Sequence, residues 1–152
     1  TEAHRAEEQN FQVRNARGER LAALLRTPMG APVGRCMVIA HGFRDNKHGR
    51  LVATLSEAVD WTQTIRFDMS GNGESEGPFR FSNYADECED LRAVVLHARL
   101  ALKLTVDCVV GHSKAGSAVL LYAAKYADVQ LVDNVPGRFD MTRGVFALSK
   151  TP

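Results

Sequence analysis

The chain has 152 residues, of which 45% are hydrophobic and 24% charged, and its formal net charge is +1. This length predicts a single domain over residues 1–152, with enough apolar residues for a buried core. The near-neutral charge argues against nucleic acid or an anionic membrane surface as a partner. No apolar run reaches the roughly 18 residues that indicate a membrane span.

The N-terminal residues and the cysteines indicate the compartment. Residues 1–10 are polar and hold no apolar signal-peptide segment, so we expect a cytoplasmic protein, although an upstream segment is left open by the absence of a starting Met. The spacing of Cys36, Cys88 and Cys108 does not suit a metal site. We expect buried reduced thiols rather than a disulfide between Cys36 and Cys108.

Strand and helix patterns alternate along the chain. Residues 11–14 and 21–25 predict a hairpin that turns at 15–18. Apolar runs then predict buried strands at 36–40, 64–67, 107–110 and 129–135. Helical spacing is found at 47–61 and at 113–126. A third, long helix is predicted to begin after a cap at Asn83, with Asp86 and Glu87 in its first turn. The pattern predicts an α/β fold, with a mostly parallel sheet flanked by helices.

Three loops with unusual residues each follow one of these buried strands. They are His41-Gly42-Phe43, the segment Asp68–Gly77, and Gly111–Gly116. In parallel α/β sheets, sites form beyond the carboxyl ends of the strands. We therefore expect the three loops to meet in one functional site.

Ser113 lies where the third of these strands turns into an apolar helix. Gly111 and Ala115 flank it at two-residue spacing, so the pattern is Gly-x-Ser-x-Ala, close to the Gly-x-Ser-x-Gly turn that exposes a nucleophilic serine. The helix N-terminus would favour negative charge developing beside the hydroxyl. The alternative is that Ser113 only caps the helix.

In order and spacing, these loops resemble those of the α/β-hydrolase superfamily, in its esterase, lipase and acyltransferase-like branch, over about residues 21–140. The resemblance implies that Ser113 is the nucleophile and that the backbone N–H groups of Phe43 and Lys114 form the oxyanion hole. It also implies supporting roles for His41 and Gly42, for Asp68, Gly71 and Gly73, and for Gly111 and Ala115. It implies a small-molecule acyl substrate, and no cofactor or metal.

Several of these residues also have plainer interpretations. His41 is expected to shape the oxyanion turn rather than act as a base, and His112 to pack beneath the serine turn. His48 and His97 are expected on helices at the surface or its boundary, and the side chain of Lys114 to be exposed. A dinucleotide site at Gly71-Asn72-Gly73 is disfavoured, because the spacing is wrong and acidic residues follow.

A proton acceptor for Ser113 is missing from the sequence. The family order is Ser, then an acid, then His, yet no histidine follows Ser113 and the later acids are only Asp128, Asp133 and Asp140. We expect an α/β-hydrolase domain lacking the last two strands and the lid, with weak or no esterase activity. It could be a fragment, a degenerate non-catalytic binding protein, or a chain completed by a partner. The strand at 129–135 would then be an exposed edge, which predicts a homodimer or a tendency to aggregate.

Overall fold

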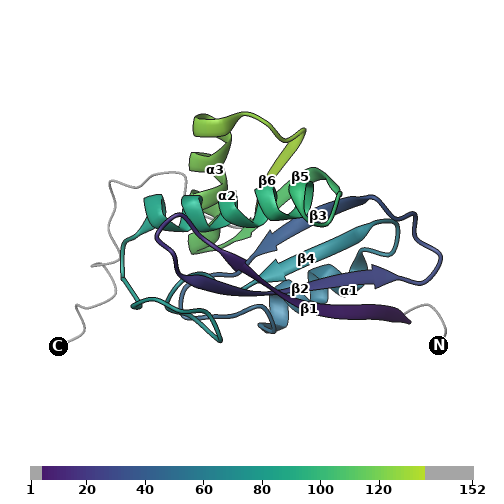
Figure 1. Ribbon diagram of the computed structural model, residues 1–152, viewed down its shortest axis with the longest axis horizontal. Helices are drawn as coiled ribbons and strands as arrows, with labels where there is room; N and C mark the ends of the chain where they lie inside the picture. Colours follow the sequence, from purple (N-terminus) through teal and green to yellow (C-terminus); the bar gives the residue numbers. More distant parts are fainter. Residues whose placement is uncertain (1–4, 136–152) are drawn as a thin grey trace.

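The computed structural model describes residues 5–135, which form six strands and three helices (Figure 1). Their bounds are β1 Ala6–Arg14, β2 Arg20–Pro28, β3 Arg35–Ala40, α1 Arg50–Ala58, β4 Gln63–Phe67, α2 Tyr84–Leu100, β5 Thr105–His112, α3 Lys114–Tyr126 and β6 Leu131–Val135. Every predicted strand and helix is present. None of the helices in this part of the chain is long and apolar enough to cross a bilayer.

The strands form one mixed sheet in the order β1-β2-β4-β3-β5-β6. The predicted hairpin is the antiparallel pair β1 and β2, and β2 also pairs antiparallel with β4. The pairs β3–β4, β3–β5 and β5–β6 are parallel. The predicted α/β class with a mostly parallel sheet is therefore confirmed, and β6 forms one edge of the sheet in residues 5–135.

Helices cover both faces of the sheet (Figure 1). Alternate residues of β3 point to opposite faces: Val38 packs in the cluster that holds the buried faces of α2 and α3, whereas Ile39 packs with Val52 of α1. Because β3, β4 and β5 are parallel, their carboxyl ends lie at one edge of the sheet, where the three unusual loops begin.

The bounds of some elements differ from the prediction. The first helix was predicted at 47–61 but covers only Arg50–Ala58, because the backbone N–H of Lys47 is held by Asp68 and Gly49 has an extended ψ of 139°. His48 therefore lies before the helix, where it is exposed, and not on it. The last strand starts at Leu131 rather than 129.

The three cysteines are buried and free, as predicted. Burial raises the pKa of the Cys36 thiol to about 12 and that of the Cys108 thiol to about 11. Both thiols are therefore protonated and weakly nucleophilic at neutral pH.

Candidate active site

Ser113 has the strained backbone of a residue at a sharp turn between strand and helix. It separates β5 from α3, with φ 53° and ψ −114°, a region that costs a non-glycine residue about 1–3 kcal/mol. Its N–H donates to the carbonyl of Val135 on β6 at 2.9 Å, and its carbonyl accepts from the N–H of Gly116 at 2.9 Å. The turn is thus fixed by the neighbouring strand and by the first turn of its own helix.

Gly111 allows this turn to close. A Cβ on Gly111 would lie 2.2 Å from the carbonyl oxygen of Ala115 and 2.8 Å from the nitrogen of Gly116. The strand and the helix therefore approach to a distance that no other residue at position 111 permits. This is the close approach that the small residues around Ser113 predicted.

The loop after β3 lies directly against the serine turn. A Cβ on Gly42 would be 3.2 Å from the Cβ of Ser113 and 3.3 Å from the carbonyl oxygen of His112. The next residue in this loop is Phe43. On the other side, Lys114 is the first residue of α3, so the N–H of Lys114 has no acceptor within the helix. The structure thus brings the loop that carries Phe43 to the turn that carries Ser113 and Lys114.

Both ring nitrogens of His41 contact the backbone. Nε2 accepts from the N–H of Met69 at 3.0 Å, so the proton is on Nδ1, which lies 2.8 Å from the carbonyl oxygen of Gly42. Burial lowers the pKa of this histidine, which favours the neutral ring. His41 thereby joins the loop after β3 to the loop after β4.

Asp68 organises the glycine-rich loop after β4. It is fully buried and accepts from the backbone N–H of Lys47 at 2.6 Å, from Nζ of Lys47 at 2.9 Å, and from the N–H of Glu74 at 2.9 Å. A Cβ on Gly73, at φ 52°, would lie 2.3 Å from a carboxylate oxygen of Asp68, and one on Gly71, at φ 75°, would lie 2.5 Å from the backbone of Pro78. Only glycine fits at these two positions.

Lys47 has a role in this loop that the sequence did not indicate. Its side chain is 2% exposed and pairs with both Asp68 and Glu74. Although burial opposes the charged form, the hydrogen bonds to Glu74 and Asp68 raise the pKa of Lys47. Nothing in the residues around Lys47 indicated this, because its partners are 21 and 27 residues away.

The prediction of an exposed Lys114 side chain was wrong. That side chain is 8% exposed, and Nζ donates to Oε1 of Glu87 at 2.6 Å and to Oδ1 of Asn83 at 2.9 Å. Asn83 occupies the N-cap position of α2, but its side chain forms no capping hydrogen bond. Burial raises the pKa of Glu87, and the other oxygen of this carboxylate, Oε2, has no partner.

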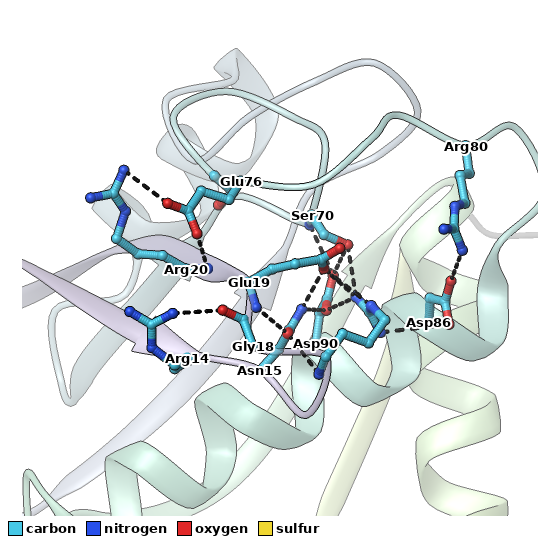
Figure 2. A network of polar contacts seen from close by, with 12 residues as sticks. Arg14, Asn15, Gly18, Glu19, Arg20, Ser70, Glu76, Arg80, Asp86 and Asp90 are labelled. Atoms are coloured by element: carbon cyan, nitrogen blue, oxygen red, sulfur yellow. Dashed lines mark hydrogen bonds and ion pairs between the residues drawn. The ribbon is translucent and has the colours of Figure 1, made fainter.

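Asp90 of α2 is another buried carboxylate, and it accepts hydrogen bonds from two other segments of the chain (Figure 2). It accepts from the hydroxyl and the backbone N–H of Ser70, at 2.7 and 2.8 Å, and from the side chains of Asn15 and Arg17 in the hairpin turn, at 2.8 and 2.6 Å. Asp90 thus joins the β1–β2 turn, the glycine-rich loop and α2.

No base contacts Ser113 within residues 5–135. Neither His41 nor His112 forms a hydrogen bond with its hydroxyl, His97 stacks on Phe11 at 5.2 Å, and His48 is exposed. Nδ1 of His112 is buried without a partner, as suits a residue packed beneath the turn.

The acids that follow Ser113 are also engaged elsewhere or outside this part of the structure. Asp128 pairs with Arg92 and Arg99 of α2, Asp133 is exposed on β6, and Asp140 lies outside the described residues. The described part of the chain holds no cluster of three or more His, Cys, Asp or Glu that could bind a metal.

Comparison with solved structures identifies the fold. An esterase from Pyrococcus furiosus superimposes with a TM-score of 0.79 and 15% identity, covering 97% of this chain and 57% of that one. Est1E from Butyrivibrio proteoclasticus, solved with ferulic acid bound, gives 0.74 and 26% identity, covering 84% and 53%. A serine hydrolase without lid from Xanthomonas campestris gives 0.69 and 21%, covering 84% and 60%.

The chain therefore spans a little over half the length of these three solved structures. No family model matches the sequence, and no curated protein matches it by sequence. The likeness is carried by the arrangement of strands and helices rather than by a high level of sequence identity.

Proposed function

We propose that this chain, which has the α/β-hydrolase fold, is a serine hydrolase of carboxylic esters or related acyl substrates. The observation that carries the proposal is the strained, positive-φ backbone of Ser113 at the end of β5, packed against the loop of Phe43. The P. furiosus neighbour is an esterase and the X. campestris neighbour a serine hydrolase, which supports the same chemistry here.

In this proposal Oγ of Ser113 attacks the substrate carbonyl carbon and loses its proton to an acceptor outside residues 5–135. The N–H groups of Phe43 and Lys114 stabilise the negative oxygen that forms, and each such donor contributes about 3 kcal/mol in serine hydrolases. The alcohol leaves, and water then hydrolyses the acyl-serine ester. Without a histidine, hydrolases of this kind keep roughly 10³–10⁴-fold acceleration over water.

Hydrolysis of 4-nitrophenyl butanoate tests this proposal, measured with and without added imidazole as a substitute base. The matched variants are Ser113→Ala and Thr105→Ala, since Thr105 is exposed and begins β5 at the end of the strand away from Ser113. We expect a slow rate that rises with imidazole by more than in Ser113→Ala, and that is unchanged in Thr105→Ala. Equal rates for wild type and Ser113→Ala in both buffers would overturn the proposal.

A non-catalytic binding protein is the second candidate, favoured by one observation: no histidine follows Ser113 in the sequence. It predicts no Ser113-dependent turnover even with imidazole, while an ester analogue still binds at the turn. The imidazole series therefore separates the two candidates.

A further inference from the structure

Three phenylalanine rings gather on the surface beside the serine turn. Phe43, Phe79 and Phe81 are 43%, 42% and 49% exposed, and we call them the phenylalanine cluster. The Phe43 ring meets Phe79 edge-on at 5.7 Å between centroids and Phe81 at 5.3 Å. Exposed apolar residues that occur singly are ordinary, whereas a contiguous group of exposed apolar side chains is typical of a ligand-binding or interaction surface.

The cluster is continuous with the proposed oxyanion hole. Phe43 supplies one of the two proposed N–H donors, and Lys114 supplies the other. Nζ of Lys114 lies 5.9 Å from the centre of the Phe43 ring and 6.0 Å from that of Phe79. Phe43 also follows Gly42 directly, and a Cβ on Gly42 would lie 3.2 Å from the Cβ of Ser113, so the cluster begins on the loop that packs against the serine turn.

The segment that carries Phe79 and Phe81 is held in place by contacts at both of its ends. The backbone of Pro78 packs against Gly71, where a Cβ would lie only 2.5 Å away. Lys114 is tied to Asn83 and Glu87 at the start of α2, close in sequence to Phe79 and Phe81. A surface fixed in this way binds a flat ligand at a lower cost in conformational entropy.

The charges around the cluster restrict the ligand. The ammonium group of Lys114 is neutralised by Glu87, whereas the guanidinium of Arg44 lies 5.9 Å from the centre of the Phe79 ring and forms no ion pair with any residue of 5–135. A cationic ligand would be repelled by Arg44. An uncharged aromatic group gains edge-to-face contacts with the rings.

We propose that the phenylalanine cluster binds the aromatic group of an uncharged aromatic ester, in a subsite next to Ser113. This proposal rests on the proposed function, because it names the substrate class of the same site. Esters with an aromatic group within a few bonds of the carbonyl would be preferred over aliphatic esters of similar size.

Binding of two ketones tests the subsite without requiring catalysis. 4-Phenylbutan-2-one copies the shape of an aromatic ester but cannot be hydrolysed, and 4-cyclohexylbutan-2-one is its aliphatic comparison of similar size. Dissociation constants are measured by NMR chemical-shift titration for wild type, Phe79→Ala, Phe81→Ala and Phe81→Leu. The control is Trp61→Ala, which removes an aromatic ring that is 61% exposed and lies at the opposite end of the sheet, before β4.

We expect the wild type to bind the phenyl ketone more tightly than 4-cyclohexylbutan-2-one. Phe79→Ala and Phe81→Ala, with unchanged circular dichroism, should weaken phenyl ketone binding roughly two- to tenfold. Phe81→Leu should weaken it similarly and Trp61→Ala should not. Equal binding of the two ketones, or an equal loss in Trp61→Ala, would overturn the subsite.

The outcome is separable from that of the proposed function, because Ser113→Ala should bind the phenyl ketone as the wild type does. Ring-dependent binding without Ser113-dependent turnover would support the aromatic site and reject the hydrolase. Ser113-dependent turnover, with ketone binding that does not depend on the phenylalanine rings, would support the hydrolase and reject the aromatic subsite.

Discussion

Replacing Gly111 by alanine probes the close approach on which the serine turn depends. The added Cβ would lie 2.2 Å from the carbonyl oxygen of Ala115, 2.5 Å from its carbonyl carbon and 2.8 Å from the nitrogen of Gly116. All three are backbone atoms, so no side chain can rotate away. Restoring a 3.0 Å contact needs a shift of about 0.8 Å at the start of α3, and overpacking of this kind costs typically 1–3 kcal/mol, occasionally more.

We expect Gly111→Ala to lose about 3 kcal/mol of unfolding free energy, which for a domain of this size lowers Tm by roughly 6–12 °C. Urea unfolding followed by circular dichroism measures the change. The control is Gly18→Ala, where φ is 82° but no atom lies within 4 Å of the added Cβ, so only backbone strain of about 1–2 kcal/mol is introduced. A Gly111→Ala protein no less stable than Gly18→Ala would refute the reasoning.

Three more predictions concern other contacts. Lys114→Met leaves Glu87 buried without its cation and should cost about 3–5 kcal/mol by urea unfolding, while adding Glu87→Gln should recover most of the loss. Burial raises the pKa of Glu87 in the folded state, so protonation of Glu87 at low pH stabilises that state. The unfolding free energy lost in Lys114→Met should therefore be smaller at pH 5 than at pH 8, and an equal loss at the two pH values would contradict this. Asp90→Ala leaves the donors of Ser70, Asn15 and Arg17 without their acceptor and should destabilise by about 3 kcal/mol; a loss under about 1 kcal/mol would show that Asp90 does not hold these segments. We also propose a homodimer through the β6 edge, where Leu131 is 64% exposed. Sedimentation should show a dimer that Leu131→Lys weakens, and a monomer at high concentration would exclude this dimer.

The features that could be predicted from the sequence are those set by local pattern. Short apolar strands that lead into His41, Asp68 and the turn at Ser113 were enough to predict a parallel sheet with three loops at one edge, because strand direction determines where such loops meet. The tight turn at Ser113 followed from the small residues on either side of it.

The contacts that could not be predicted join residues far apart in the chain. The burial of Lys114 depends on Glu87, 27 residues earlier, and an acidic residue in the first turn of a helix is ordinarily explained by the helix dipole. The truncated first helix likewise follows from the hydrogen bond between Lys47 and Asp68. Local propensity carries no information about either partner.

Labelling with a fluorophosphonate probe in imidazole buffer, located by peptide mass spectrometry, tests most directly whether Ser113 is a nucleophile. We expect one adduct on Ser113 in the wild type and in Thr105→Ala, and none in Ser113→Ala. An unlabelled Ser113, or equal labelling of the wild type and Ser113→Ala, would contradict it.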